Sequence, residues 1–291
     1  MTPASDRPVR RLVRGVLLAM VVVVLLVLAI RERYAPRLTL TVRDILSQPQ
    51  RPLEASLRDE LQLRLYSTTR PHLGKIAALQ KGLVLVHQGR ELIEEGYGFG
   101  LPIIEADGVA HISRHAATSL VQQSRGVSLV KAYQIDVVDR PTRPFRVKYA
   151  DVTALGTVVF TYTIRTPDAI DVQVDFSGLD GQWDRAYLMN EQGARFFTRY
   201  LDPTGEALDA TEVGIWERAT APFGCWEAPT RRLRFCVEAE PGRQGFVGRE
   251  RYRQYNWLGF YALSWSGVDI AVDAPLDTYA YTIQVREVPG P

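Results

Sequence analysis

The sequence predicts an all-β protein: a large antiparallel β-sandwich, of the simple or supersandwich type, preceded by one N-terminal transmembrane helix. Three observations lead to this prediction. Beyond residue 66, apolar and polar residues alternate with the two-residue period of half-buried strands. The same region has no long amphipathic helical pattern. Near the N-terminus lies an uncharged apolar run over residues 15–30.

The apolar run, GVLLAMVVVVLLVLAI, is predicted to be an anchor that contacts the lipid bilayer through residues 15–30. At about 1.5 Å per residue it makes a helix of roughly 24 Å. Leu12 and Val13 extend the helix to about 28 Å, close to the ~30 Å hydrocarbon core. Arg14 lies within the extension, and an arginine near a helix end places its guanidinium among the headgroups. A buried core helix normally has a polar face, and this run has none.

The charges before the run predict its orientation. Four arginines and one acid precede it: Asp6, Arg7, Arg10, Arg11 and Arg14. Basic residues gather on the cytoplasmic side of a membrane span. The protein is therefore predicted to be a single-pass plasma-membrane protein with its C-terminal domain outside the cytoplasm. A cleaved signal peptide, ending near residues 27–29, is the alternative, and it places the domain in the same compartment.

The chain divides into four predicted parts. A short cytoplasmic tail (1–14) and the anchor (15–30) are followed by a juxtamembrane segment and spacer (31–52) and an extracytoplasmic β-sandwich domain (53–291). The first 34 residues contain six arginines and two acids, so the other 257 residues carry a formal net charge of −2. A nucleic-acid surface needs a clustered positive excess, so no nucleic-acid partner is expected.

The strands of the domain can be followed in order. Residues 53–66 are ambiguous, because their leucines fit both a helical and an alternating spacing. Residues 156–165 and 169–176, around a turn at 166–168, predict a hairpin with one wet face. The other predicted strands cover residues 83–86, 127–137, 145–149, 185–189, 195–200, 213–218, 233–238, 268–272 and 278–287.

At this hairpin the sequence resembles a known family. The segment GTVVFTYTIRTPDAIDVQVDF, followed after a loop by RAYLMNEQGARFF, is similar to the central strands of galactose-mutarotase-like supersandwich domains. The resemblance implies a domain that handles sugars on a broad concave sheet. The catalytic histidine of that family is expected just after the hairpin, where this chain has Asn190 and Glu191. Mutarotase chemistry is therefore not implied.

Two local motifs are given structural interpretations. His111 and His115 have the spacing of a zinc-binding helix, but four residues on a strand span about 13 Å, too far to share one ion. No metal site and no cofactor are expected. The glycine-rich residues 96–100 are not followed by a helix that would complete a phosphate cradle, so we expect a bulged or closely approached strand.

No catalytic motif is recognised. The four histidines all lie at or before residue 115, so no Ser/His/Asp set can be assembled. Four acids near aromatic residues are candidates for a glycosidase pair: Asp184, Glu191, Glu217 and Glu227. Three of them directly follow a tryptophan, at positions 183, 216 and 226. A buried tryptophan on a strand leaves the next side chain on the exposed face, which is the simpler explanation.

Residues 246–265 hold the predicted ligand site. This segment combines alternating arginines with seven aromatic residues. Aromatic faces stack on sugar rings and guanidinium forks bind carboxylates, a combination that suits an acidic glycan. In the alternative interpretation the aromatics fill the core and the arginines are solvated. The candidate ligand-binding residues are Arg249, Arg251, Arg253, Tyr255, Trp257 and Trp265.

The two cysteines predict a disulfide. Cys225 and Cys236 are symmetric about a turn near Thr230 and Arg231. A hairpin centred there sets them directly opposite each other, at a Cα separation of about 4.5–5.5 Å that permits a bridge. The expected compartment is oxidising. Two free thiols packed in the core are the alternative.

Three functions are compatible with these features. The first is a membrane-anchored extracytoplasmic module that binds carbohydrate or another envelope polymer. The second is a structural or interaction subunit of a membrane-linked complex. The third is a carbohydrate-active enzyme of lyase, hydrolase or epimerase type. We favour the binding module and the structural subunit over the enzyme, because no catalytic constellation is evident, and we take the binding module as the first hypothesis.

Overall fold

The computed structural model of the protein describes residues 15–26, 53–66, 82–93, 98–123, 126–138, 150–209, 214–220, 223–239, 244–251 and 264–288. Residues 15–26 form a helix, and η1 (Pro229–Arg231) is a single 3₁₀ turn. All other regular structure among the described residues is β-strand, which confirms the predicted all-β class.

The eighteen strands have the following bounds. They are β1 (Leu53–Arg58), β2 (Leu61–Leu65), β3 (Leu83–His87), β4 (Arg90–Glu91), β5 (Phe99–Ala106), β6 (Val109–Gln123), β7 (Gly126–Val138), β8 (Ala150–Thr166), β9 (Ala169–Leu179), β10 (Arg185–Gln192), β11 (Arg199–Leu201), β12 (Ala207–Asp209), β13 (Gly214–Thr220), β14 (Phe223–Ala228), β15 (Leu233–Ala239), β16 (Gln244–Arg251), β17 (Ser264–Asp273) and β18 (Thr278–Glu287).

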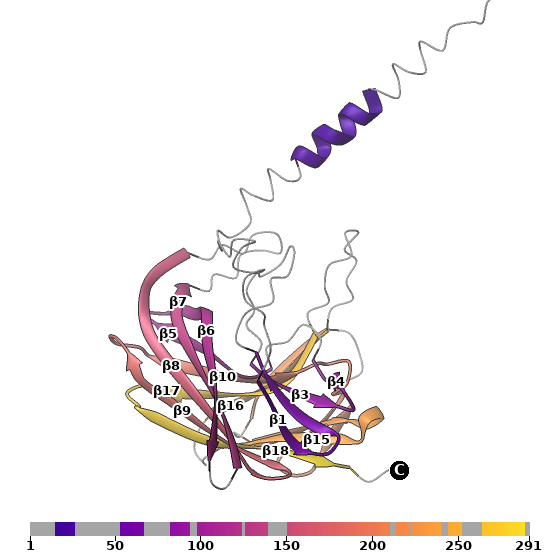
Figure 1. The fold of residues 1–291 in the computed structure, drawn as a ribbon, viewed down its shortest axis with the longest axis vertical. Helices are drawn as coiled ribbons and strands as arrows, with labels where there is room; N and C mark the ends of the chain where they lie inside the picture. The colour runs from indigo at the N-terminus through magenta and orange to yellow at the C-terminus, as the bar shows by residue number, and fades with distance from the viewer. Residues whose placement is uncertain are drawn as a thin grey trace, which may run out of the picture.

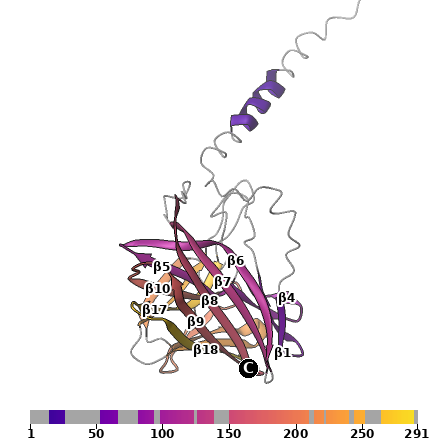
Figure 2. The ribbon, with the colours of Figure 1, turned by 60° about the vertical axis from the view of Figure 1, so that its left-hand side comes forward.

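The strands form one large antiparallel sheet. Its pairings run β12–β11–β14–β15–β18–β9–β8–β7–β6–β5–β10–β17–β16–β13. A short branch, β1–β2–β3, joins β5 at the pair Leu83 and Phe99, and β4 pairs with β3. Figures 1 and 2 show β6, β7, β8, β9 and β18 side by side, with β5, β10 and β17 behind them.

Hydrogen bonds between strands that are not sheet neighbours show that the sheet folds over into two layers. The Tyr281 hydroxyl on β18 donates to Oδ1 of Asn190 on β10 at 2.9 Å. The Tyr162 hydroxyl on β8 donates to the Phe99 carbonyl on β5 at 3.2 Å. One continuous cluster of buried apolar side chains fills the space between the layers. The predicted β-sandwich is therefore the observed architecture.

The β8–β9 hairpin confirms the clearest local prediction. Thr166 pairs with Ala169 across a two-residue turn. On β9 the apolar residues Ile170 and Val172 are buried, and Gln173 between the buried positions is exposed. One face therefore packs on the core and the other is solvated, as the period-two pattern predicted.

Two other segments needed the structure to decide them. The ambiguous residues 53–66 form the hairpin β1–β2, because alternation buries Leu61, Leu63 and Leu65 in the core. The strand predicted over residues 195–200 is wrong for its first four residues. The Gly193 carbonyl accepts the N–H groups of both Phe196 and Phe197, so the chain turns there and β11 begins only at Arg199.

The glycine-rich segment is closely approached by its neighbours, as expected. Gly98 and Gly100 both have positive φ, of 80° and 74°. A Cβ on Gly100 would lie 1.7 Å from the Tyr162 hydroxyl oxygen, and one on Gly98 would lie 2.8 Å from the Leu83 carbonyl oxygen. The two glycines thus let β8 and β3 pack directly against this backbone.

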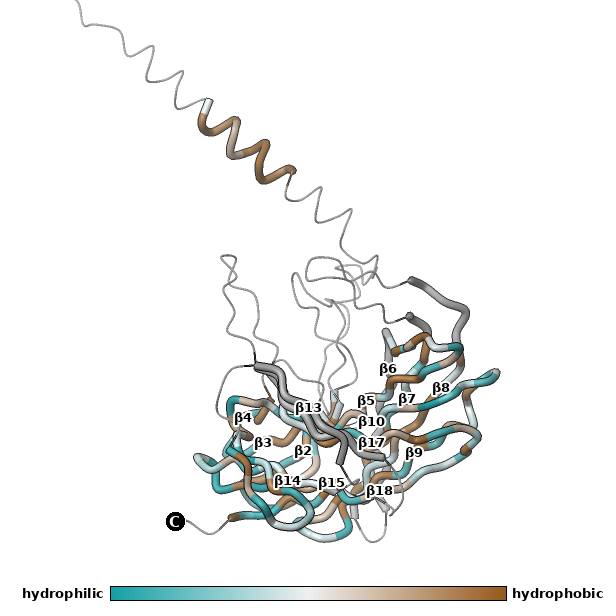
Figure 3. Tube along the Cα trace, turned by 180° about the vertical axis from the view of Figure 1, so that it is seen from behind, coloured by the Kyte–Doolittle hydropathy of each residue, from teal (hydrophilic) through white to brown (hydrophobic). Residues whose placement is uncertain are grey.

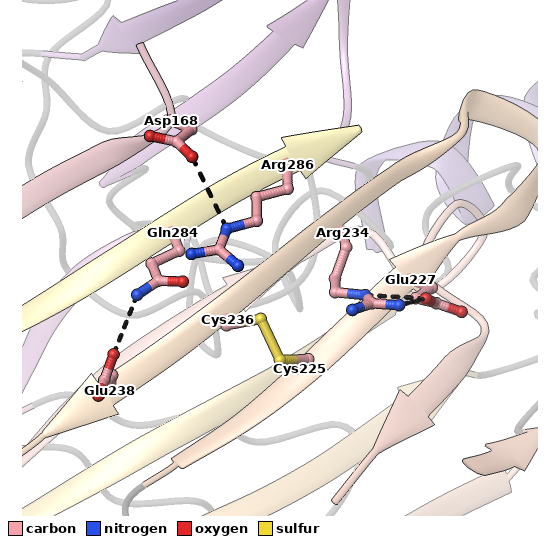
Figure 4. The surroundings of a disulfide bond; sticks show 8 residues. All are labelled: Asp168, Cys225, Glu227, Arg234, Cys236, Glu238, Gln284 and Arg286. Atoms are coloured by element: carbon pink, nitrogen blue, oxygen red, sulfur yellow. Dashed lines mark hydrogen bonds and ion pairs between the residues drawn. A yellow bond between two sulfur atoms is a disulfide. The ribbon is translucent and has the colours of Figure 1, made fainter. Parts of the chain in front are cut away.

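The predicted disulfide is present. Cys225 and Cys236 are directly paired in the β14–β15 ladder and bonded, with their Cα atoms 4.0 Å apart (Figure 4). The turn between the strands ends at Arg232, which adopts the left-handed conformation with φ of 54°. No free cysteine occurs in the described chain, so the alternative of two thiols is wrong.

The described N-terminal helix is apolar along its length, as Figure 3 shows. Its large apolar side chains are exposed, from Val22 at 48% to Leu18 at 69%. Among the residues that the structure describes, no helix is both long enough and apolar enough to cross a membrane.

Candidate functional site

Strand β10 lies between β5 and β17 and presents a polar outer face. Its residues alternate between Ala186 and Leu188, which are buried in the core, and the half-buried Arg185, Tyr187 and Met189. The alternation follows from the two-residue period of a strand. Tyr187 is therefore held on the side of the sheet that faces away from the core.

The neighbouring strands add acids and an aromatic ring to this face. On β17 the core residues Val268, Ile270 and Val272 alternate with the outward positions. We call the combined surface the β10 face and define it by Glu105 of β5, Arg185, Tyr187 and Glu191 of β10, and Trp265, Asp269 and Asp273 of β17.

Hydrogen bonds and an ion pair connect the polar members of the β10 face. The Tyr187 hydroxyl donates to Oε2 of Glu105 at 3.3 Å. Arg185 Nε lies 2.6 Å from Oδ1 of Asp273, and this hydrogen bond raises the pKa of Arg185. Oδ1 of Asp269 accepts the Asn190 backbone N–H at 2.9 Å. The acids outnumber the single arginine, so the face is negatively charged.

Glu191 lies near the C-terminal end of β10 and is fully buried. It is paired with Gly267 of β17. A Cβ on Gly267 would lie 2.9 Å from Cγ of Glu191 and 2.7 Å from the Asn190 carbonyl oxygen. Only glycine at position 267 therefore leaves room for the Glu191 side chain in this position. Trp265 lies two residues from Gly267 on the same face, diagonal to Glu191.

The neighbours of Glu191 have structural roles in the interior. The Asn190 side chain accepts a hydrogen bond from the Tyr281 hydroxyl. The Gln192 side chain donates a hydrogen bond to the Leu83 carbonyl at 3.3 Å. The Ser266 hydroxyl donates to the Phe197 carbonyl at 2.7 Å. Buried polar groups are normally satisfied in this way. The sequence signal for this region is the run of three polar residues, 190–192, at the C-terminal end of β10.

A buried lysine is the other unusual group of the interior. Lys131 is fully buried on β7, and its Nζ lies 4.6 Å from the centroid of the Tyr133 ring. Burial lowers the pKa of Lys131 to about 7 and raises that of Tyr133 well above its ordinary value. The alternation placed Lys131 among the apolar residues of its strand, but it gave no sign that the amine would be enclosed.

The structure places half of the predicted ligand site. Arg249 and Arg251 lie on β16, where they pair with Ser266 and Ser264, and Glu250 between them pairs with Trp265. Paired residues share a face of the sheet, so Trp265 shares its face with Glu250. Arg253, Tyr255 and Trp257 lie outside the described residues. By the same rule Arg249 and Arg251 share the opposite face with Ser266 and Ser264, so the register brings Glu250, and not the arginine positions, to the face of Trp265 and Glu191.

The remaining acid candidates lie elsewhere. Asp184 is exposed and precedes β10, and Glu217 lies on β13, paired with Gly248. The expectation that the acid after a buried tryptophan is exposed is wrong for Trp226 and Glu227. Glu227 is only 4% exposed, because Arg234 and Arg199 both contact its carboxylate.

His111 and His115, which have the sequence spacing of a zinc-binding helix, both lie on strand β6. Because they lie on a strand, they are not brought together as they would be on a helix. His111 is buried beside the β5–β6 turn. Burial lowers the pKa of His111. Within the described ranges no group of three potential metal ligands occurs.

Comparisons with known proteins define the fold more closely. No family model matches the sequence. No curated protein matches it either. The structure is similar to that of the α-N-acetylgalactosaminidase NagBb from Bifidobacterium bifidum in complex with GalNAc, with a TM-score of 0.50 and 9% identity over 81% of this chain and 36% of that one.

Two further solved structures show weaker likeness. A mutant of the heparan sulfate lyase HepC from Pedobacter heparinus gives a TM-score of 0.44 at 9% identity, over 78% of this chain and 33% of that one. Heparinase III gives 0.45 at 11% identity, over 79% and 34%. The chain spans about a third of the length of these proteins. The likeness to the α-N-acetylgalactosaminidase shows a shared fold, a large antiparallel β-sandwich.

Proposed function

We propose that this chain is a membrane-anchored, extracytoplasmic β-sandwich module that binds carbohydrate or another envelope polymer on the β10 face. The observation that carries the proposal is the placement of two half-buried aromatic side chains, Tyr187 and Trp265, on one face with the carboxylates of Glu105 and Asp269. Aromatic rings offer an apolar face to a sugar ring, and carboxylates accept hydrogen bonds from its hydroxyl groups.

The fold supports the ligand class. A similar β-sandwich occurs in a protein that is named as an α-N-acetylgalactosaminidase and was solved with GalNAc. At 9% identity the ligand itself does not transfer, and neither does the activity. We further propose that the sandwich is of the galactose-mutarotase-like supersandwich type, on the sequence pattern of the β8–β9 hairpin and β10.

The segment after β16 belongs to the same proposal. Arg249 and Arg251 are on the strand next to Trp265, and Arg253, Tyr255 and Trp257 continue from its end. Guanidinium groups bind carboxylates in a fork geometry. We propose that these residues bind the acidic groups of a glycan at a contact separate from the β10 face, since Arg249 and Arg251 alternate with Glu250, the pairing partner of Trp265.

The anchor is proposed from the apolar helix. The exposed apolar side chains over residues 16–26 have no protein covering. In the sequence the apolar run continues to Ile30. A bilayer is the partner that suits an uncharged surface of this length. We therefore propose a single-pass protein whose domain from about residue 35 lies outside the plasma membrane.

A glycan array, followed by titration calorimetry with the retained glycan, tests the binding proposal on the full chain in detergent. We expect Tyr187→Ala and Trp265→Ala each to weaken binding by about tenfold, or about 1.4 kcal/mol. Trp183→Ala is the matched control. Trp183 is also a half-buried tryptophan, but it lies in the loop before β10, outside the β10 face, and stacks on Phe176. Failure of every glycan to bind, or equal affinity of all three variants, would reject the module.

Protease accessibility tests the location. Protease added to intact cells, or to spheroplasts if the cell has an outer membrane, should digest the domain. Digestion that occurs only after the inner membrane is lysed would place the domain in the cytoplasm and reject the proposed topology. A protein partner that copurifies with a chain that binds no glycan would instead favour the interaction subunit.

A further inference from the structure

Half of the basic side chains that the structure describes lie on and around the β14–β15 hairpin. Elsewhere on the described surface acids predominate. We call this group the hairpin arginine cluster. Its members are Arg58, Arg199, Arg231, Arg232, Arg234 and Arg286.

Three of these arginines lie in one line across the sheet. Arg286 of β18 pairs with Arg234 of β15, Arg234 pairs with Glu227 of β14, and Glu227 pairs with Arg199 of β11. Like charges that are directly opposed across strands destabilise a sheet. The repulsion between Arg234 and Arg286 therefore destabilises the folded sheet, and Glu227 is the single acid among these four residues.

The ion pairs of the line are unequal. Arg234 is held to Glu227 by two N–H donors, and Figure 4 shows its guanidinium turned toward that carboxylate and away from Arg286. Arg199 lies 3.5 Å from Glu227 and 3.8 Å from Asp209, and Arg286 reaches Asp168 only at 3.7 Å, so these ion pairs are long. Arg286 and Arg199 therefore keep most of their N–H donors available, and their side chains are 57% and 45% exposed.

The hairpin tip adds charge that its surroundings do not neutralise. Arg231 and Arg232 form no ion pair with any residue in the described part of the chain. Nε of Arg232 donates to the Val288 carbonyl at 3.4 Å, which fixes the start of the side chain near Arg286. The Arg231 charge contributes to the lowered pKa of the nearby His87, after burial as the larger cause.

The frame beneath the arginines is rigid. The disulfide joins the positions next but one to Glu227 and Arg234 on the same two strands. Glu227 is buried between two guanidiniums, so it orients them. Preorganised donors lose little freedom when they bind an anion.

We propose that the hairpin arginine cluster is a second binding site, for the carboxylate or sulfate groups of an acidic glycan. Arginine forks match the geometry of such groups. Arg234 and Arg199 are two strand steps apart, about 10 Å, so the line suits charges spaced along a linear polymer. The site lies on the opposite layer from the β10 face, because Trp226 between Cys225 and Glu227 points inward to β17. The inference rests on the proposed function only for its ligand class.

The test uses the full chain in phosphatidylcholine nanodiscs, with polygalacturonate and dextran sulfate as probes. The variant Arg232→Gln with Arg286→Gln removes two charges and leaves the Glu227 pairs intact. The matched control, Arg90→Gln with Arg195→Gln, removes two exposed charges outside the cluster. We expect the cluster variant to weaken binding of at least one polyanion by about tenfold at low ionic strength and the control by less than twofold.

Three results would overturn the proposal: no binding of either polyanion to the unmodified chain, equal weakening by the two double variants, or tighter association with phosphatidylglycerol vesicles than with either polyanion. The last result would assign the cluster to an anionic bilayer. Binding of a neutral glycan reports on the β10 face alone. We expect Tyr187→Ala to lose this binding and the cluster variant to keep it, so the two proposed sites can be tested independently.

Discussion

The indole Nε1 of Trp226 donates a hydrogen bond to the carbonyl of Gly267 at 3.0 Å, and this contact joins β14 to β17 across the core. Trp226 is fully buried and packs on Tyr200, with ring centroids 5.4 Å apart. On the other side of β17, Gly267 leaves the space that Glu191 occupies. One backbone position therefore connects the interior, the disulfide hairpin and the β10 face.

Trp226→Phe is expected to destabilise the domain by about 1–3 kcal/mol, because the buried carbonyl loses a donor and the smaller ring leaves a cavity. Chemical denaturation monitored by the remaining tryptophans measures the change. Trp183→Phe, at a half-buried position, should cost less. Equal losses in the two variants would mean that the hydrogen bond to Gly267 contributes nothing specific.

Gly267→Ala is expected to destabilise the domain by about 1–3 kcal/mol, as overpacking of a close-packed site usually does. The added Cβ would meet the Asn190 backbone and the Glu191 side chain, and the backbone cannot move without disturbing the β10–β17 ladder. Thermal unfolding measures the change. Ser177→Ala on the exposed side of β9 is the control and should lie within about 0.5 kcal/mol of the unmodified protein.

Loss of the disulfide should weaken the hairpin without abolishing the fold. Cys225→Ser with Cys236→Ser opens a loop of eleven residues in sequence, so the chain-entropy model predicts a loss of about 2–3 kcal/mol. The denaturant midpoint of the double variant should match that of the reduced protein. Two alkylated cysteines in unreduced protein from its native compartment would show that the bridge does not form in the cell.

A strand pairing can be predicted from the sequence when its two strands are close together along the chain. The β8–β9 and β14–β15 hairpins follow from local alternation and short turns, so their faces and the Cys225–Cys236 pair were predictable. The β10 face was not, because Glu191 meets Gly267 only through a pairing between distant strands. Similarly, Arg286 reaches Arg234 only because β18 completes the sheet beside β15. A period-two pattern identifies strands but not their order.

Lys131 makes the stability of the domain depend on pH. Its folded-state pKa is about 7, against 10.5 for an ordinary lysine. Between these values the unfolded chain holds a proton that the folded protein does not. Stability therefore rises with pH by up to about 1.4 kcal/mol per pH unit, and falls as pH decreases toward 7. Below pH 7 both states are protonated and the dependence on this group ends.

Lys131→Met should remove this dependence and raise stability at pH 7, since an apolar side chain of similar length needs no desolvation of charge. Denaturant unfolding at intervals between pH 7 and 9.5 measures both effects. The series stops at pH 9.5 because burial raises the pKa of Tyr133, Tyr162 and Tyr281. Near pH 10 these tyrosines lose their protons in the unfolded chain but not in the folded protein, which lowers stability as pH rises further. Arg165→Met, on an exposed side chain, should keep the slope of the unmodified protein. A slope that persists in Lys131→Met would show that the buried amine is not its origin.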